Sequence, residues 1–492
     1  MTNAAVIGGG FGGIAAALRL RAKGYDVTVF DRCSRLGGRA QVFEKDGFKY
    51  DAGPTVITAP QVLSELFELF GKEISNYVDI VPLETWYRFS FPDGDHFDYG
   101  GSPEKIKNEI RRINPRDVSG YEALYKDSER LYRVGYEQLA NQPFHRLMDM
   151  LKILPQMLRL RVYRSVWGLV SGHIQHDKLR QAFSVQPLLV GGNPFDTTCI
   201  YNLIHFLERE FGVHFTMGGT GALVDAFAKL MKEEGISVRL NETVIALPTV
   251  GKTIQSVRTD NGEEIPFDLV ISNADPAHLY DKMVDAKAVS RSAKLKTKYA
   301  SKSMGLFVLF FGTNMTYPDV EHHTIWLGKR YKELLSDIFD RKVLADDFSM
   351  YLHRPTATDP SFAPEGCDSF YALVPVPNMQ GGIDWDDQGP RLTPRIFDAL
   401  NGSILPGVKD NLAHSFFMTP SDFESRYLSP AGAGFSIAPK FTQSAWFRFH
   451  NKAEGPDNLY IVGAGSHPGA GLPGVISSAK VLDQLIPQVT AV

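Results

Sequence analysis

The chain contains few cysteines, the residues that form disulfides and thiolate metal sites. Its 492 residues include only three cysteines, Cys33, Cys199 and Cys367, and these are far apart in the sequence. Disulfide frameworks and thiolate metal sites need closely patterned cysteines, so we expect neither, and a reducing compartment is indicated. The net charge of −4 gives no reason to expect a nucleic-acid partner.

Long hydrophobic runs are also absent. The longest strongly apolar run covers residues 304–311, far short of the roughly twenty residues that a membrane-spanning helix needs, and it predicts a buried strand instead. No secretory signal is expected, because the apolar strand at 4–7 continues directly into a glycine-rich turn. With 43% hydrophobic and 22% charged residues, the sequence indicates a globular protein of two or three domains.

The N-terminus carries a dinucleotide-binding pattern. Gly8, Gly10 and Gly13 lie between a strand at 4–7 and a helix expected at 14–23. Gly8 permits the turn, Gly10 allows the backbone to approach a pyrophosphate, and Gly13 allows the helix to pack on the strand. Asp31 ends the next strand at about the twenty-residue offset of an acid that accepts hydrogen bonds from ribose hydroxyls, and it argues against a 2′-phosphate.

A second glycine element separates FAD from NAD as the expected cofactor. Arg32, Gly38 and Arg39 add backbone donors and guanidinium groups that can bind phosphate oxygens. The element resembles the second glycine motif of flavoproteins related to amine oxidases, GDP-dissociation inhibitors and carotenoid desaturases. The resemblance implies that the small-residue turn at Pro54 and Thr55 lies beside the flavin ring.

The C-terminus returns to the same expected site. Residues 458–465 predict a buried strand and a glycine turn containing Gly463 and Gly465. Gly474 and Val475 then precede a helix expected at 476–485, whose N-terminus would face the pyrimidine end of the flavin and favour negative charge there. One FAD site is therefore expected from both ends of the chain.

The middle of the chain supplies further parts of the expected FAD domain. A helix at 224–234 is followed by a two-stranded ribbon with a turn at 261–262 and by a strand at 269–274. By resemblance to the same flavoproteins, the backbone of Val244 contacts the adenine. No second dinucleotide motif follows a strand, so no separate nicotinamide domain is expected.

These elements predict an α/β fold with two main parts. A Rossmann-like FAD-binding domain is expected from residues 1–75, 215–290 and 440–492. A mixed α+β substrate domain is expected from residues 76–214 and 291–439, with a helical lobe at 143–174 that associates with a membrane.

The lobe at 143–174 combines basic and apolar residues. Five basic residues are interleaved with Leu, Met, Tyr and Trp: Arg146, Lys152, Arg159, Arg161 and Arg164. Such helices can lie in a membrane interface, with Met148, Met157 and Trp167 reaching the acyl boundary. The alternative is an ordinary basic helix packed on a protein core.

Further motifs resemble the bacterial and fungal phytoene desaturases over essentially the whole chain. They lie at residues 53–58, 189–213, 363–366, 443–448 and 463–475. One departure concerns Thr216 and Met217, which stand where related sequences carry Pro-Arg. A cation near the flavin edge is thereby absent, which leaves the number of steps and the electron acceptor open.

The resemblance implies an FAD-dependent oxidoreductase of carotenoid biosynthesis. It would desaturate phytoene to lycopene or a partly desaturated carotene by successive hydride transfer to flavin and proton loss, and quinone or oxygen would reoxidise the flavin. The expected location is cytoplasmic and peripheral, on the inner face of the cell membrane. The rival functions are a redox-neutral, FAD-containing carotene isomerase and a non-catalytic escort that binds isoprenoids.

Candidates for proton transfer are few, because a strongly acidic carbocation needs positioning more than a powerful base. Asp149, alone among basic and apolar neighbours, is the candidate for proton handling, against the alternative of a helix-surface salt bridge. Glu208 and Glu210 are interpreted equally well as surface charges of a helix. His322 and His323 have no partner ligands nearby in the sequence, so no metal site is expected.

Overall fold

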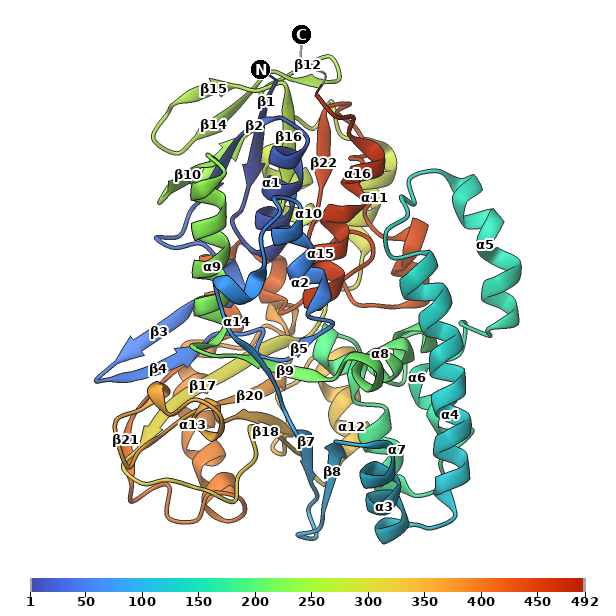
Figure 1. The fold of residues 1–492 in the computed structure, drawn as a ribbon, viewed down its shortest axis with the longest axis vertical. Coiled ribbons are helices and arrows are strands. Elements are labelled where there is room, and N and C mark those ends of the chain that lie inside the picture. The colour runs from blue at the N-terminus through green and yellow to red at the C-terminus, as the bar shows by residue number, and fades with distance from the viewer. Residues whose placement is uncertain (1, 490–492) are drawn as a thin grey trace.

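A five-stranded parallel sheet forms the upper part of the molecule in the computed structural model, which describes residues 2–489 (Figure 1). The strand order is β10-β2-β1-β16-β22. The strands are β1 (Asn3–Ile7), β2 (Asp26–Asp31), β10 (Ser237–Leu240), β16 (Leu269–Ser272) and β22 (Leu459–Ile461). Every strand is parallel to its neighbours, so their carboxyl ends meet at one edge, where α/β proteins bind nucleotides.

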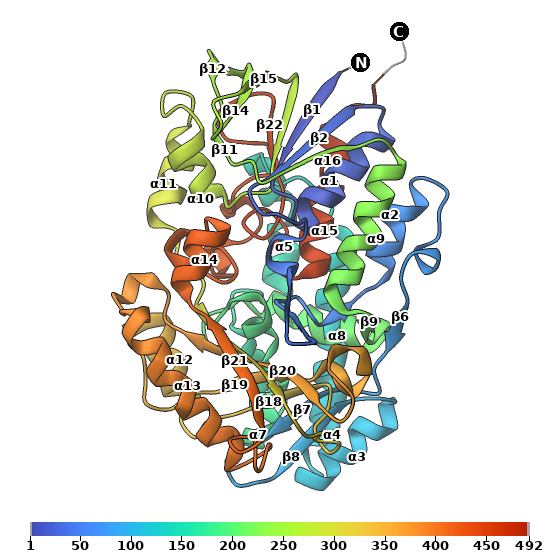
Figure 2. The same cartoon turned by 90° about the vertical axis from the view of Figure 1, so that its left-hand side faces the viewer.

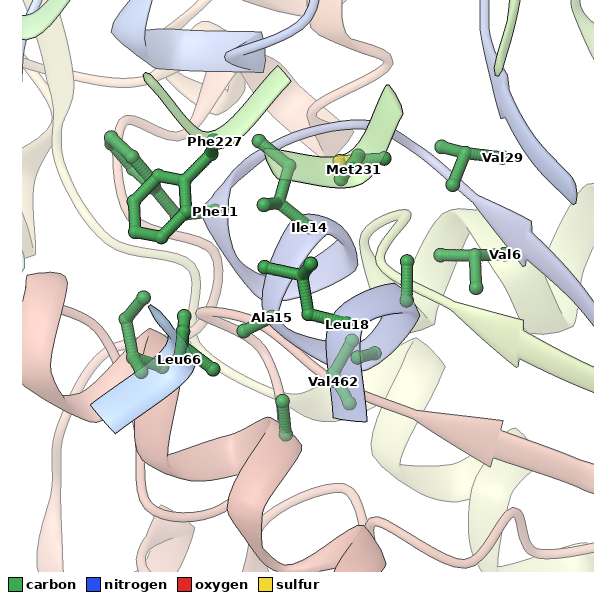
Figure 3. Close-up of a cluster of buried hydrophobic side chains, with 14 of the residues drawn as sticks. Val6, Phe11, Ile14, Ala15, Leu18, Val29, Leu66, Phe227, Met231 and Val462 are labelled. Atoms are coloured by element: carbon green, nitrogen blue, oxygen red, sulfur yellow. The ribbon is translucent and has the colours of Figure 1, made fainter. Parts of the chain in front are cut away.

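Helices from distant parts of the chain pack on one face of this sheet. They are α1 (Phe11–Ala22), α2 (Gln61–Glu68), α9 (Gly219–Glu233) and α15 (Leu472–Lys480). Val6 and Val29 point from the strands into a buried cluster that also contains Phe11, Phe227 and Val462 (Figure 3). Alternate residues such as Ala5 and Ile7 point to the other face, as the two-residue period of a strand requires.

The other face carries a small antiparallel sheet and short helices. The sheet joins β11 (Val244–Ala246), β14 (Ser256–Thr259) and β15 (Glu264–Pro266), and a two-stranded ribbon joins β12 (Thr249–Val250) and β13 (Thr253–Ile254). The predicted turn at 261–262 lies between β14 and β15. The helices α10 (Pro276–His278) and α11 (Arg291–Tyr299) follow on this face, whereas the short helix α16 (Leu482–Leu485) packs in the cluster of the first face.

A seven-stranded mixed sheet forms the lower part (Figure 2). Its order is β21-β17-β20-β19-β18-β7-β8, and the bounds are β7 (Thr85–Ser90), β8 (His96–Gly100), β17 (Gly305–Thr313), β18 (His323–Trp326), β19 (Met350–His353), β20 (Asp368–Val376) and β21 (Leu412–Met418). The predicted buried strand at 304–311 is confirmed as β17, which is buried throughout. Helix α13 (Trp385–Asn401) packs on one face, and the other face turns towards the upper part.

Short strands connect the two parts. β3 (Val42–Lys45) and β4 (Phe48–Asp51) form a hairpin, and β5 (Ile57–Thr58), β6 (Ile80–Pro82) and β9 (Val213–Thr216) form a three-stranded sheet. Helix α14 (Pro420–Tyr427) adds to the connection, whereas α12 (Tyr331–Ser336) belongs to the same buried cluster as residues of β7 and β18. The parallel sheet and the mixed sheet therefore confirm the α/β fold, while the residue boundaries of the two domains stay a prediction.

A helical lobe flanks both sheets. It contains α3 (Pro103–Ile113), α4 (Asp117–Tyr132), α5 (Leu147–Arg159), α6 (Val166–Ser171), α7 (Asp177–Phe183) and α8 (Leu203–Phe211). Helix α5 lies on the outer side of this lobe (Figure 1). None of the helices within residues 2–489 is long and apolar enough to cross a bilayer.

Three helices begin earlier than the sequence predicts. α1 begins at Phe11 instead of residue 14, α9 at Gly219 instead of 224, and α15 at Leu472 instead of 476. In each case the first turn contains glycine or proline, residues with poor helix propensity that conceal the apolar periodicity. Each glycine motif is therefore partly inside its helix, and the backbone N–H groups of the first turn lie at the motif itself.

Candidate cofactor and substrate site

A single cavity of about 600 Å³ extends between the two sheets. Its lining includes most of the residues predicted to bind FAD: Gly8, Gly10, Asp31, Arg32, Gly38, Arg39, Pro54, Thr55, Val244, Gly465, Gly474 and Val475. Residues from both ends of the chain therefore meet at one cavity. Gly13, Gly463 and Asp149 lie outside this lining.

The first glycine turn is closely packed around its helix. A Cβ atom on Gly13 would lie 1.9 Å from the carbonyl oxygen of Gly8, so helix α1 can approach its strand only with glycine there. A Cβ atom on Gly10 would lie 3.0 Å from the nearest atom, the side-chain nitrogen of Asn273. Gly13 is therefore needed for packing, whereas Gly10 borders open space in the cavity.

Asn273 joins the two ends of the chain. Its side-chain nitrogen donates to the carbonyl of Gly8 at 3.3 Å. A Cβ atom on Gly463 would lie 2.4 Å from its side-chain oxygen, and one on Gly12 would lie 2.5 Å from the same atom. The sequence pattern placed Asn273 inside a strand at 269–274 and missed its role, because β16 ends at Ser272 and Asn273 lies at the carboxyl edge of the sheet, where site residues are concentrated.

Asp31 holds the first turn in place. One carboxylate oxygen accepts from the backbone N–H of Gly9 at 2.6 Å and the other from that of Cys33 at 2.8 Å. Burial raises the pKa of Asp31, although these hydrogen bonds oppose the change. Each oxygen keeps a further lone pair, so Asp31 can organise the turn and also accept from a ligand hydroxyl.

Arg39 is a cation without a carboxylate hydrogen-bond partner at the cavity wall. Its Nη2 donates to the neutral hydroxyl of Ser429 at 3.0 Å, and its buried Nε has no partner among the described residues. Burial lowers the pKa of this guanidinium. The carboxylate of Asp275 is near enough to act on this charge but forms no hydrogen bond to it among the described residues, and a pyrophosphate would supply a hydrogen-bonded anion. The site therefore fits a dinucleotide cofactor.

The C-terminal turn is fixed from behind by Arg448. This side chain is buried and donates to the carbonyls of Ala464 and Ser466 and, at 3.3 Å, of Gln443. It holds the turn that carries Gly463 and Gly465. α15 follows with Gly474 and Val475, and its early start at Leu472 places its first turn on the cavity.

The remaining predicted residues are spread along the cavity. Arg32 is exposed at its rim and donates to the carbonyl of Ser425. Val244 borders the end near Asp31, while Pro54 and Thr55 border the part nearer the lower sheet. The Thr55 hydroxyl is hydrogen-bonded to the hydroxyls of two tyrosines of that sheet, Tyr351 at 2.9 Å and Tyr371 at 2.7 Å.

The part of the cavity below these residues is almost wholly apolar. Side chains of helices α5, α8 and α12 and of strands β18 to β20 line it: Met150, Ile153, Met157, Leu203, Ile204, Leu207, Ile325, Leu327, Leu334, Leu335, Met350 and Leu373. Such a lining provides hydrophobic burial and few hydrogen bonds. It suits an elongated hydrocarbon.

Glu208 is the exception in this apolar part. The surface interpretation was wrong for Glu208, which is fully buried and borders the cavity, and right for Glu210, which is exposed. Glu208 accepts from the hydroxyl of Tyr87 at 2.9 Å and from that of Tyr99 at 3.1 Å. Burial raises its pKa to about 7.

Asp149 lies in the first turn of α5. One of its carboxylate oxygens accepts from the backbone N–H of Arg146 at 3.2 Å, as in a capping box. It is half-buried and borders no part of the cavity, unlike its neighbour Met150. This geometry accounts for Asp149 as a helix cap, and its role in proton handling stays a prediction.

His322 and His323 do have a neighbour that sequence proximity could not reveal. β18 pairs with β19 so that His323 lies opposite His353, and the three buried imidazoles have ring nitrogens within 4.8 Å of one another. Burial lowers all three pKa values, that of His353 to about 3. Nε2 of His353 lies 3.9 Å from Asp51, whose pKa burial raises to about 7. The histidines are therefore neutral at pH 7.

Comparison with known proteins agrees with this geometry. The family model of flavin-containing amine oxidoreductases matches residues 11–481. The chain is 46% identical to the lycopene-forming phytoene desaturase of Pantoea ananas, over 98% of each chain. It is 44% identical to the neurosporene-forming phytoene desaturase of Rhodobacter capsulatus, over 99% of this chain and 94% of the other.

Solved structures share the fold at low sequence identity. An oxidoreductase from Methanosarcina mazei has a TM-score of 0.66 at 15% identity and covers 98% of this chain and 100% of its own. Putrescine oxidase has a TM-score of 0.62 at 15% identity, with 98% and 99% covered. The matches over nearly the full length show that the chain belongs to the flavin-containing amine oxidoreductases and, within them, to the phytoene desaturases.

Proposed function

We propose that the protein desaturates phytoene in carotenoid biosynthesis and forms lycopene or a partly desaturated carotene. The main support for this function is the cavity, which combines a dinucleotide-binding end with a long apolar end. A carotene has no polar group for an enzyme to bind or polarise. Its position must therefore be set by the shape of the apolar lining.

When bound, FAD would supply the acceptor for the hydride that is removed from the carotene. Gly8 and Gly10 would leave room for the pyrophosphate at the start of α1, and Arg39 would supply a positive charge to it. Asp31 would accept from the ribose, and the first turn of α15, with Gly474 and Val475, would lie at the flavin ring. The apolar side chains of α8 and β18 to β20 would hold the carotene and exclude water.

Expression in cells that accumulate phytoene tests this function. Pigment chromatography would show new conjugated double bonds, and the spectrum would identify the product as lycopene, neurosporene or a less desaturated carotene. Isomerised phytoene without new double bonds would support the carotene isomerase instead. Bound isoprenoid without any conversion, in protein that contains flavin, would support the escort.

The electron acceptor is proposed to be a quinone or oxygen. The proposal rests on the sequence, in which no second dinucleotide motif follows a strand. Anaerobic enzyme with phytoene in liposomes should bleach its flavin absorbance, and addition of a quinone should restore it. Stoichiometric reduction of NADP⁺ during desaturation would contradict this proposal.

We further propose that α5 docks on the inner face of the cell membrane. Four exposed apolar residues recur along one side of the helix at 147, 151, 154 and 158, the spacing of a helix face. Met150, Ile153 and Met157 of the same helix line the cavity. The helix thus separates the cavity from the exposed apolar side, which is where a carotene dissolved in the bilayer would enter.

The three residues expected to reach the acyl boundary differ in their exposure. Met148 is exposed, as insertion requires, whereas Met157 is buried at the cavity and Trp167 packs against Phe195 and Tyr331. Lys152 and Arg159 are exposed beside the apolar side of α5. Anionic headgroups would attract them with about 1 kcal/mol for each cation near the surface.

A further inference from the structure

Desaturation needs an acceptor for a proton as well as for a hydride. Each new double bond removes two hydrogens from adjacent carbons. One leaves with both electrons of its C–H bond, and the oxidant takes them. The other leaves as a proton, and the electron pair of its C–H bond becomes the second bond between the two carbons. Some group at the cavity must take this proton or pass it to water.

The apolar part of the cavity contains one carboxylate, Glu208. The other acids of the lining, Asp31, Glu242 and Asp275, lie at the dinucleotide end. A carboxylate within a hydrocarbon-binding surface makes no contribution to binding a carotene and costs free energy to bury. Helix α8 also presents Leu203, Ile204 and Leu207 to the cavity, so the face of the helix is apolar except at Glu208.

We propose that Glu208 is a catalytic residue that accepts the proton released in each desaturation. Its carboxylate would take the proton from the carbon next to the oxidised position and become a neutral carboxylic acid. The acid would then lose this proton before the next cycle. The inference rests on the desaturase function and adds to it the group that receives the proton.

The surroundings of Glu208 suit a carboxylate that changes its charge. Tyr87 and Tyr99 donate one hydrogen bond to each oxygen of the ionised form. Tyr99 also lies 2.8 Å from Nδ1 of His205, and because its hydroxyl hydrogen is used on Glu208, it accepts from Nδ1–H. The two hydrogen bonds stabilise the anion, while burial favours the acid, so neither form is strongly excluded.

Most other titratable groups near Glu208 are uncharged at neutral pH and therefore affect its ionisation little. They are His205 and Arg209 on α8, Tyr87 on β7, Tyr99 on β8, Tyr121 on α4 and His323 on β18. Burial lowers the pKa of His205 to about 3, and lowers that of His323, so both are neutral. Burial raises the pKa of the tyrosines. Arg209 is the cation among these groups, and it favours the ionised carboxylate.

The test compares Glu208→Gln with Glu210→Gln, which makes the same change at an exposed position of the same helix. Single-turnover desaturation in liposomes should fall about 10²- to 10⁴-fold in Glu208→Gln, the usual contribution of general base catalysis, and stay unchanged in Glu210→Gln. The wild-type rate should fall as the pH drops below about 7, and this decrease should be absent in Glu208→Gln. FAD content and phytoene binding should be unchanged.

Tyr87→Phe distinguishes a proton acceptor from a structural contact. Removal of this hydrogen bond should raise the pKa of Glu208 and move the pH dependence of the rate to higher pH. A merely structural Glu208 would give no such displacement.

Infrared titration provides a measurement that does not need turnover. Wild-type protein should show carboxylic acid absorption that disappears with a midpoint near pH 7, and the part of it that is due to Glu208 should be missing in Glu208→Gln. Asp51 titrates in the same range, so the absorption of Glu208 is assigned by its loss in this variant. FAD-containing Glu208→Gln that desaturates phytoene at the wild-type rate with the wild-type pH dependence would overturn the proposal. So would titration spectra in which wild type and Glu208→Gln show the same carboxyl absorption, whatever the activity.

Discussion

Helix α5 offers a sharp test of membrane docking. Four of its apolar side chains are about half exposed: Leu147 at 53%, Met148 at 59%, Leu151 at 47% and Leu158 at 57%. Together they present the apolar surface of about two whole side chains. Full burial of such a side chain stabilises by about 1.5–3 kcal/mol, so insertion of the four should contribute about 3–6 kcal/mol. Replacement of all four by Ser should weaken liposome binding about 10²- to 10⁴-fold.

Flotation with neutral and anionic liposomes measures this effect. The loss should persist at high salt, because apolar insertion is not screened, whereas Lys152→Gln with Arg159→Gln should weaken binding to anionic liposomes only at low salt. The matched control is Val250→Ser with Leu295→Ser, two exposed apolar residues outside the lobe, which should leave binding unchanged. If the α5 variant floats like the wild type at every salt concentration, α5 does not insert and the docking surface is elsewhere.

Three further predictions concern the cofactor site and the buried histidines. Gly10→Ala should fold but lose FAD from its absorbance spectrum, whereas Gly13→Ala should fail to fold, because its Cβ would lie 1.9 Å from a backbone oxygen. Arg39→Met should weaken FAD binding in equilibrium dialysis by about 1.5–3 kcal/mol, the range for a charged hydrogen bond, and Arg39→Lys should restore part of it. In the unfolded chain His353 takes up a proton below pH 6.5, whereas in the folded protein its pKa is lowered to about 3. Acidification therefore stabilises the unfolded state first, so the contribution of neutral His353 to folding stability is present above pH 6.5 and is lost as the pH falls. Between pH 6.5 and pH 5 the urea-unfolding free energy of the wild type should therefore fall by up to about 2 kcal/mol more than that of His353→Gln, and equal decreases would contradict this assignment.

The sequence predicts the cofactor end of the cavity well because its determinants are local. Gly8, Gly10 and Asp31 lie within one strand, turn, helix and strand, and their spacing alone indicates a dinucleotide. The strands of the parallel sheet follow from similarly local patterns, whereas β17 is the strand of the mixed sheet that the sequence predicts. The helix starts were predicted late because glycine in the first turn interrupts the apolar periodicity, although the same glycines identify the site.

The substrate end could not be predicted in the same way, because its residues acquire their roles from distant partners. Glu208 is buried by Tyr87 and Tyr99, which precede it by more than one hundred residues. His353 reaches His323 only through the pairing of β18 with β19. Met157 and Met148 have the same residue type, yet one faces the cavity and the other faces outward. Composition and periodicity contain no information about these pairings.

The position of β22 has a consequence for biosynthesis. This strand, Leu459–Ile461, completes the parallel sheet beside β16, and Gly465 and α15 complete the wall of the cavity after it. A ribosome must therefore synthesise β22 and α15 before the nucleotide site is complete, more than four hundred residues after the glycines of its first motif. FAD loading must therefore follow the synthesis of β22 and α15, and until β22 has been made, β16 is an unpaired sheet edge. Supply of FAD during expression should accordingly influence how much protein escapes aggregation, and not only how much of it is active.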